Sequence, residues 1–164
     1  MRDKKYAGII AGLFVVAVTA FTIWGTDFLK AKNTDEAVAM DVNGAEGVKE
    51  ASKMQDKDGN VTGYKIVTST KGFGGDVELT ISFEADGTTV SGMELGENKE
   101  TAGLGSKIGD AEYTATLQGV AAPVQLKGSN GTGTEIEAVT GATFSSKAVE
   151  EGINSAYNFI QANK

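Results

Sequence analysis

Residues 77–95 read VELTISFEADGTTVSGMEL. In the first half of this stretch apolar side chains alternate with polar ones, which is typical of a β-strand with one buried face. The Asp86-Gly87 pair favours a tight turn, after which residues 89–95 are expected to return as a second strand. The β-branched residues 64–70 predict another strand before this hairpin. The sequence therefore predicts an antiparallel sheet.

The last 20 residues predict a helix, because apolar side chains recur there at helical spacing on one face. These side chains are Val149, Ile153, Ala156 and Ile160. Residues 110–119 predict a shorter helix, and the glycine-containing residues 98–108 and 127–134 predict loops. The expected fold class is therefore α+β, an antiparallel sheet with flanking helices.

Two loops carry fragments of known binding motifs. Asp56-Lys57-Asp58-Gly59-Asn60 begins like a calcium-binding EF-hand loop, but the positions that need Gly and Glu are Val61 and Val67. Residues 127–134 lack the Gly-Lys-Ser/Thr ending of a phosphate-binding loop. We interpret both segments as turns, and we expect no metal site.

Composition limits the chemistry. A chain of 164 residues can form one domain with its own core, and this one contains neither cysteine nor histidine. Disulfides, thiolate or histidine metal sites, cysteinyl iron–sulfur clusters, lipid anchors on cysteine and histidine-dependent nucleophiles are therefore excluded. Any chemistry must therefore come from a bound cofactor or be done by carboxylates.

The N-terminal region differs from the rest of the chain. Residues 6–26 carry no charged side chain and are long enough, at about 30 Å as a helix, to span a membrane. Residues 1–5 are mostly basic, which favours a cytoplasmic N-terminus, so residues 63–164 are expected outside the cytoplasm as the functional domain. Residues 27–62 are expected to be a polar linker leading into that domain, with weak helical tendency up to about residue 55. The alternative is a cleaved signal peptide, for which Ala37-Val38-Ala39 offers a cleavage site.

Charge divides at the same place. Residues 1–32 hold five basic and two acidic side chains, so the total charge of −7 leaves −10 for residues 33–164. A domain this acidic is not suited to binding nucleic acid or an anionic lipid surface. Solubility explains the acidity, and the spacing of the acids does not single out a docking face for a basic partner.

Hydroxyl side chains cluster just before the C-terminal helix, where residues 137–146 read EAVTGATFSS. Ser and Thr at a helix start commonly cap its free N–H groups, and the residues alone favour that interpretation. The alternative is an anion site, because the positive end of a helix dipole attracts phosphate. Gly141 and Ala142 would leave room for a bulky group to approach the Thr143 hydroxyl.

Three blocks resemble one family. Thr140-Gly141-Ala142-Thr143, followed by Ser145 and Ser146, resembles the S/T-G-A-T motif of the FMN-binding domains in the Rnf and Nqr electron-transport complexes. Residues 72–76 resemble the family's G-Y/F-G-G block, and residues 100–105 its E-T-P-G-L-G block. The resemblance runs from about residue 63 to residue 160, and the compact chain with an N-terminal helix is closer to the G subunit of Rnf than to the longer C subunit of Nqr.

Two positions depart from the family's pattern. Glu137 replaces the Asp that usually lies six residues before the modified threonine, and Ala102 replaces the proline of the second block. The first change bears on the efficiency of flavin attachment. The second affects loop stiffness, because proline fixes φ and alanine does not.

The resemblance implies that Thr143 carries FMN through a phosphoester, attached by a separate FMN transferase that takes FMN from FAD. It implies an electron-relay protein among the other membrane subunits of an Rnf-type ferredoxin:NAD oxidoreductase, coupled to sodium or proton translocation, with no substrate turnover of its own. One alternative is a stand-alone extracytoplasmic FMN carrier of extracellular electron transfer, and another is a membrane-anchored binding module without flavin. The implied cofactor-binding residues, besides Thr143, are Thr140, Gly141, Ala142, Ser145, Phe73, Gly74, Glu100, Thr101, Gly103 and Leu104. Phe73 and Leu104 are candidates to contact the flavin ring, although packing in the core would explain them equally well.

Overall fold

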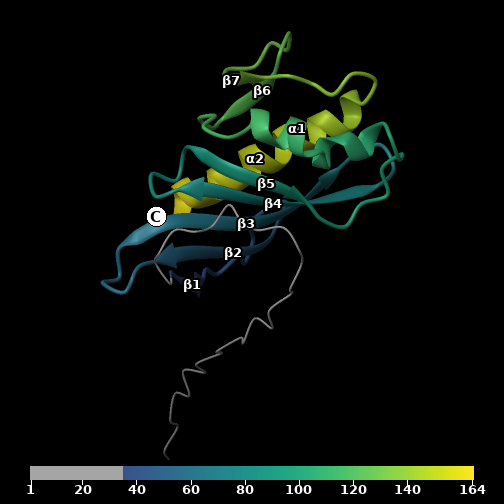
Figure 1. Cartoon of the computed structure of the whole chain (residues 1–164). Helices are drawn as coiled ribbons and strands as arrows, with labels where there is room; N and C mark the ends of the chain where they lie inside the picture. Colours follow the sequence, from purple (N-terminus) through teal and green to yellow (C-terminus); the bar gives the residue numbers. More distant parts are fainter. Residues whose placement is uncertain (1–34) are drawn as a thin grey trace, which may run out of the picture. The chain divides into compact units, whose positions relative to one another are not determined.

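The computed structural model describes residues 35–164, whose course is shown in Figure 1. The predicted cytoplasmic N-terminus, residues 1–5, and the predicted transmembrane helix, residues 6–26, lie outside the described residues. Within residues 35–164, no helix is both long and apolar enough to cross a membrane.

The described residues form an α+β fold, as predicted, with an antiparallel sheet and a long C-terminal helix. Its elements, in chain order, are β1 (Glu36–Ala39), β2 (Val48–Gln55), β3 (Val61–Lys71), β4 (Asp76–Glu84), β5 (Val90–Leu95), the 3₁₀ turn η1 (Gly105–Gly109), α1 (Ala111–Thr116), β6 (Val124–Leu126), β7 (Thr134–Ile136) and α2 (Thr143–Asn163).

The main sheet contains β1 to β5 side by side in sequence order, each antiparallel to its neighbours. The β4–β5 hairpin turns where the sequence predicts it, at Asp86-Gly87. The Asp86 carboxylate accepts hydrogen bonds from the backbone N–H groups of Thr88 at 2.7 Å and Thr89 at 2.8 Å. Gly87 adopts φ +66°, a conformation that favours glycine, so the turn depends on both residues.

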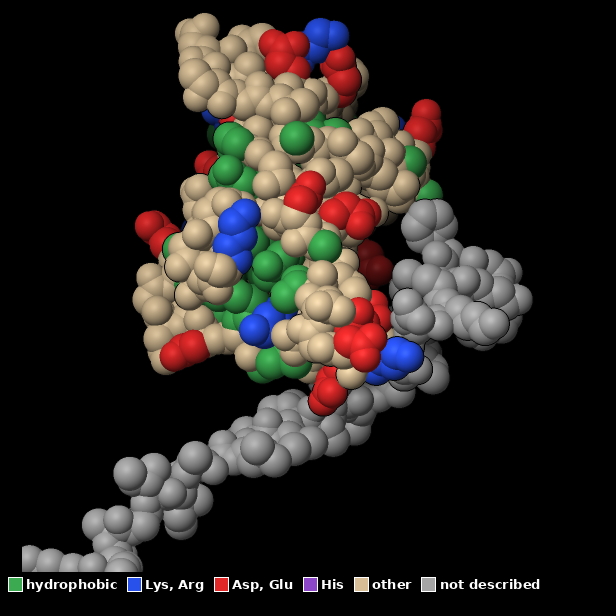
Figure 2. Space-filling model, turned by 90° about the vertical axis from the view of Figure 1, so that its left-hand side faces the viewer, with side chains coloured by type: hydrophobic (Ala, Val, Ile, Leu, Met, Phe, Trp, Pro, Cys, Tyr) green, Lys and Arg blue, Asp and Glu red, His purple; other side chains and the backbone are tan. Residues whose placement is uncertain are grey.

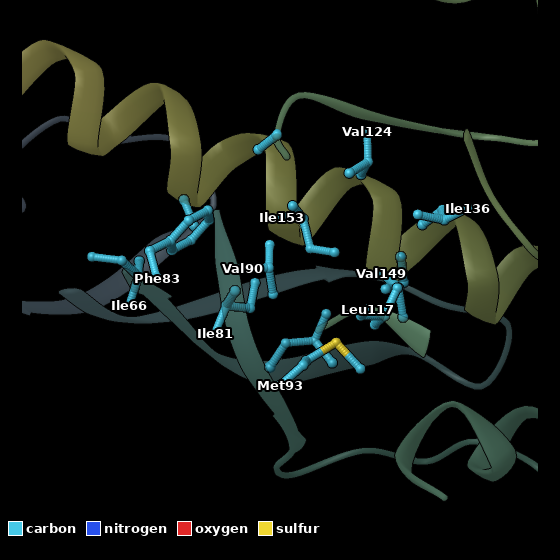
Figure 3. Close-up of a cluster of buried hydrophobic side chains, with 14 of the residues drawn as sticks. Ile66, Ile81, Phe83, Val90, Met93, Leu117, Val124, Ile136, Val149 and Ile153 are labelled. Atoms are coloured by element: carbon cyan, nitrogen blue, oxygen red, sulfur yellow. The ribbon is translucent and has the colours of Figure 1, made fainter. Parts of the chain in front are cut away.

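One face of the sheet is covered by α2. Every second residue of β4, from Val77 to Phe83, is at most 2% exposed and faces the core. Figure 3 shows Ile153 of α2 directed toward Val90 of the sheet, and Val149 beside Leu117. The apolar side chains at helical spacing in α2 and at alternating positions in β4 therefore form one core.

A two-stranded parallel sheet, β6 with β7, packs on α2. The Asn154 side chain of α2 accepts a hydrogen bond from the Val124 N–H at 2.8 Å and donates one to the Val124 carbonyl at 2.9 Å. This pair of bonds holds β6 against the helix. The sequence did not predict either short strand.

The predicted linker is wrong in its described part. Instead of a polar segment with weak helical tendency, residues 36–39 and 48–55 form β1 and β2, so the Ala37-Val38-Ala39 motif lies in an edge strand. Ala51 is the buried residue of β2, opposite Ile66, and the other side chains of β2 are exposed or half-buried. β2 is paired on both sides, with β1 and with β3, and this pairing stabilises a strand whose own sequence shows little alternation.

The two segments interpreted as turns are confirmed as connections. Asp56 closes the β2–β3 turn by accepting the N–H groups of Asp58 and Asn60, each at 2.9 Å. Residues 127–133 connect β6 to β7.

Figure 2 shows Asp and Glu side chains scattered over several parts of one face rather than gathered in one patch.

Candidate functional site

Three segments that are distant in sequence meet at one pocket of about 360 Å³. They are the loop between β3 and β4, the loop between β5 and η1, and the start of α2. The lining residues are Phe73, Glu100, Thr101, Leu104, Gly105, Gly141, Ala142, Thr143, Phe144 and Ser145. The three blocks singled out in the sequence therefore form a single site.

Thr143 is the first residue of α2 and is exposed. Ala142 occupies the N-cap position and supplies no side-chain cap. Within residues 35–164 the Thr143 hydroxyl makes no hydrogen bond, so it is available at the edge of the pocket.

The turn before α2 is held by Ser146. Its buried hydroxyl accepts the Val139 N–H at 2.9 Å and donates to the Ala142 carbonyl at 3.0 Å. Gly141 adopts φ +77°, and a Cβ there would lie 3.4 Å from Leu104 Cδ2. A side chain at position 141 would therefore be strained, so glycine is favoured there.

Glu100 connects the three segments. Its Oε1 accepts the Gly74 N–H at 2.8 Å, and its Oε2 accepts the Ser145 hydroxyl of α2. The carboxylate therefore ties the loop after β3 and the first turn of the helix to its own loop.

The glycines around Glu100 are required by close packing. A Cβ at Gly72 would lie 2.4 Å from Glu100 Oε1, and one at Gly105 would lie 2.2 Å from Oε2. A Cβ at Gly74 would lie 1.9 Å from the Lys99 carbonyl oxygen. A side chain at Gly74 would push the β3–β4 loop away from the backbone of the β5–η1 loop, and one at Gly72 or Gly105 would displace the Glu100 carboxylate.

Large apolar side chains surround the opening. Phe73 is 71% exposed, Phe144 63% and Leu104 47%, and these are the exposed large hydrophobic residues of the described part of the chain. The rings of Phe73 and Phe144 lie 6.2 Å apart, tilted by 44°. Sequence reasoning assigned Phe73 and Leu104 to the site but missed Phe144, whose signal was its place directly after Thr143. Since Phe73 and Leu104 are exposed, packing in the core does not account for them.

Three residues of the predicted set do not line the pocket. Gly74 lies behind it and bonds Glu100, and Gly103 donates its N–H to Ser106 Oγ at 3.0 Å in the adjacent turn. Thr140 is exposed outside the lining. Gly74 and Gly103 therefore take part through backbone hydrogen bonds next to the pocket and not as part of its wall.

Glu137 also lies outside the lining. It pairs with Lys127 at 2.6 Å, and both side chains are mostly exposed. The hydrogen bond from Lys127 to Glu137 raises the pKa of the lysine. An exposed pair of this kind adds little to stability.

A larger and shallower groove, of about 1090 Å³, lies along another side of α2. It is lined largely by polar side chains from residues 41–48, the end of β3 and the outer face of the helix. None of the residues that the sequence predicted for the site lines it. The smaller pocket is therefore the candidate functional site.

The α+β domain has a free hydroxyl at the start of α2, beside two glycine-rich loops and an exposed apolar rim. Such a site suits a ligand with both an anionic and an apolar part. Residues 72–158 match the FMN-binding domain family. The chain belongs to this family.

The chain is similar to three proteins that are named as G subunits of oxidoreductase complexes. It is 33% identical over 110 residues to the G subunit of the ion-translocating oxidoreductase complex of Methanosarcina acetivorans, covering 67% of this chain and 57% of that protein. It is 35% identical over 108 residues to the G subunit of the Na(+)-translocating ferredoxin:NAD(+) oxidoreductase complex of Acetobacterium woodii, covering 63% and 51%. It is 27% identical over 153 residues to the G subunit of the proton-translocating ferredoxin:NAD(+) oxidoreductase complex of Clostridium ljungdahlii, covering 90% and 82%. The chain thus spans about half the length of the first two relatives.

Two solved structures share the fold. One is the C subunit of the Na(+)-translocating NADH-quinone reductase of Parabacteroides distasonis, with a TM-score of 0.54, 22% identity and coverage of 68% of this chain and 62% of that one. The other is NqrC of Shewanella oneidensis, with a TM-score of 0.56, 20% identity and coverage of 70% and 61%.

Proposed function

We propose that the chain is the flavin-carrying G subunit of an Rnf-type ferredoxin:NAD oxidoreductase and relays electrons through one FMN esterified to Thr143. The observation that carries the proposal is the meeting of three blocks in one pocket, with the free Thr143 hydroxyl at its edge. The names of the relatives support the same assignment.

The pocket suits both parts of FMN. The isoalloxazine ring is flat and largely apolar, and Phe73, Phe144 and Leu104 offer it an apolar rim that is exposed to solvent. The N–H groups at the start of a helix have no partner within the helix, and they favour a phosphate attached to Thr143. Gly141, beside that hydroxyl, lines the same pocket.

Bound FMN supplies the electron chemistry, and the protein supplies position and electrostatics. Thr143 Oγ1 is the acceptor atom of the ester. A threonine hydroxyl is a weak nucleophile, and the chain has no histidine to activate it. A separate FMN transferase therefore removes the hydroxyl proton as the Oγ1–P bond forms, while the pyrophosphate bond of FAD breaks and AMP leaves. The exposure of Thr143 gives such an enzyme access.

The same proposal places the protein in a membrane. Residues 6–26 anchor it, the basic residues 1–5 stay in the cytoplasm, and the FMN-binding domain lies outside. Other membrane subunits deliver and remove the electrons that drive sodium or proton translocation. A phosphoester is valuable there, because a flavin lost outside the cytoplasm could not be replaced.

Mass spectrometry tests the site. Protein co-produced with an FMN transferase should be heavier than its sequence by one esterified FMN, and peptide mapping should place the added mass on Thr143. Thr143→Ala should abolish flavin fluorescence in a denaturing gel, while Thr132→Ala, an exposed hydroxyl outside the pocket, should retain it. Thr140→Ala should reduce modification. Fluorescence that survives Thr143→Ala would refute the assignment.

A further inference from the structure

Glu100 is the only ionisable side chain among the residues that line the pocket in the described part of the chain. The rest of the lining consists of apolar side chains, glycine and hydroxyl residues. Within residues 35–164 the structure contains no ion pair to Glu100, and the ion pairs there involve other acids. The charge of this carboxylate is therefore not neutralised by a neighbouring cation.

The position of the charge is fixed. Both carboxylate oxygens accept hydrogen bonds, Oε1 from the Gly74 N–H and Oε2 from the Ser145 hydroxyl. Gly72 and Gly105 pack so closely on it that neither has room for a Cβ. Moving the side chain away from this position would break both hydrogen bonds.

We propose that Glu100 is a positioning residue whose negative charge lowers the reduction potential of the flavin. The inference rests on the proposed attachment of FMN to Thr143. When the ring accepts two electrons and one proton from a reductant, it gains one negative charge. A carboxylate in the wall of the same pocket repels that charge and favours the oxidised ring. The contacts of Glu100 also join the three segments that form the pocket.

Glu100→Gln separates charge from shape. The amide oxygen can accept the Gly74 N–H, and the amide nitrogen can donate to the Ser145 oxygen, so both contacts are kept while the charge is removed. The flavin-loaded variant should have a higher reduction potential than the wild type. We expect the equilibrium constant for two-electron reduction to rise about tenfold, which corresponds to about 30 mV.

The measurement is a potentiometric titration of purified, flavin-loaded protein with dithionite in the presence of redox mediators, followed by flavin absorbance. Glu97→Gln removes an exposed carboxylate outside the pocket and should leave the potential unchanged. Ser145→Ala deletes one contact but keeps the Glu100 charge, so it should shift the potential by much less than Glu100→Gln. Equal shifts in Glu100→Gln and Ser145→Ala would mean that the contacts, and not the charge, set the potential.

The outcomes separate this inference from the proposed function. A normally loaded Glu100→Gln protein with the wild-type potential would overturn the role of Glu100 and leave the attachment at Thr143 intact. Wild-type protein without flavin would overturn both. If Glu100→Gln acquires no flavin, Glu100→Asp replaces it, because the shorter side chain withdraws the charge. Its potential must then rise by a smaller amount, and an unchanged value would refute the inference.

Discussion

Gly74→Ala tests whether the pocket depends on the close approach of its two loops. An alanine Cβ at this position would lie 1.9 Å from the Lys99 carbonyl oxygen and 3.2 Å from the Glu100 nitrogen. Because the first contact is with backbone, no side-chain rotation relieves it. The loops must separate by about 1.5 Å to reach the 3.4 Å of an ordinary contact.

The cost has two parts. Overpacking of this kind destabilises proteins by about 1–3 kcal/mol. The movement also breaks the hydrogen bond from the Gly74 N–H to Glu100, worth about 1 kcal/mol near the surface. Alanine recovers roughly 0.4–1 kcal/mol by restricting the unfolded chain. We therefore expect a loss of about 2 kcal/mol in the free energy of unfolding, together with a fall in flavin loading by the transferase.

Urea denaturation of residues 35–164, followed by circular dichroism, measures the first effect, and flavin absorbance per protein measures the second. Gly92→Ala is the matched control, because a Cβ at that position in β5 has no atom within 4 Å and no positive φ. It should be more stable than the wild type by about 0.4–1 kcal/mol, because alanine restricts the unfolded chain without strain here, and it should keep wild-type loading. If Gly74→Ala were as stable and as well loaded as Gly92→Ala, the close packing of the two loops would not hold the pocket together.

The other predictions concern the helix start, the turn, the pocket rim and the topology. Thr143→Ala should leave the protein assembled in its complex, because it removes only an exposed hydroxyl and methyl. Ferredoxin-to-NAD electron transfer and ion uptake in vesicles should nevertheless fall to near background. Normal rates would show that the flavin is bypassed. The Thr89 and Thr88 N–H groups hold the pKa of Asp86 below its ordinary value, so Asp86→Ala should destabilise the domain by about 1 kcal/mol near neutral pH. That difference should shrink as the pH falls through the lowered native pKa, and a constant difference down to about pH 2.5 would contradict the assignment. Phe144→Ala should increase quenching of the bound flavin by iodide, because it removes part of the rim; unchanged quenching would place the flavin elsewhere. A reporter fused after Lys164 should be active only if it works outside the cytoplasm, and protection of the domain from protease in intact spheroplasts would reverse the proposed orientation.

Local sequence predicts β4 but does not predict β2, β6 or β7. In β4 the buried residues alternate with Glu78, Thr80 and Ser82, so the strand is legible without any knowledge of its neighbours. In β2 only Ala51 is buried, and its pairing with β3 supplies the stabilisation. The three-residue strands β6 and β7 are too short to show a period, and the contact of Asn154 with Val124 that holds β6 crosses 30 residues. Contacts between residues this far apart cannot be predicted from the sequence around either residue.

The site shows the same division. Resemblance to the family identified the three blocks, and the structure brings them to one pocket. The sequence did not reveal that Glu100 holds the blocks together, because its contacts with Gly74 and Ser145 span 26 and 45 residues. Phe144 was missed because an apolar residue in the first turn of an amphipathic helix suggests burial, whereas this one is 63% exposed.

The proposed attachment of FMN at Thr143 would have a mechanical consequence. Thr143 begins a helix of 21 residues that is buried within its first two turns, at Ser145, Ser146 and Ala148. The protein backbone at Thr143 therefore adds no flexibility to a group bonded to this residue. A cofactor attached there would move only within the reach of its own ribityl phosphate chain. Electron tunnelling slows steeply with distance, so an exchange with two separated partners would require the whole domain to swing between them as one rigid arm.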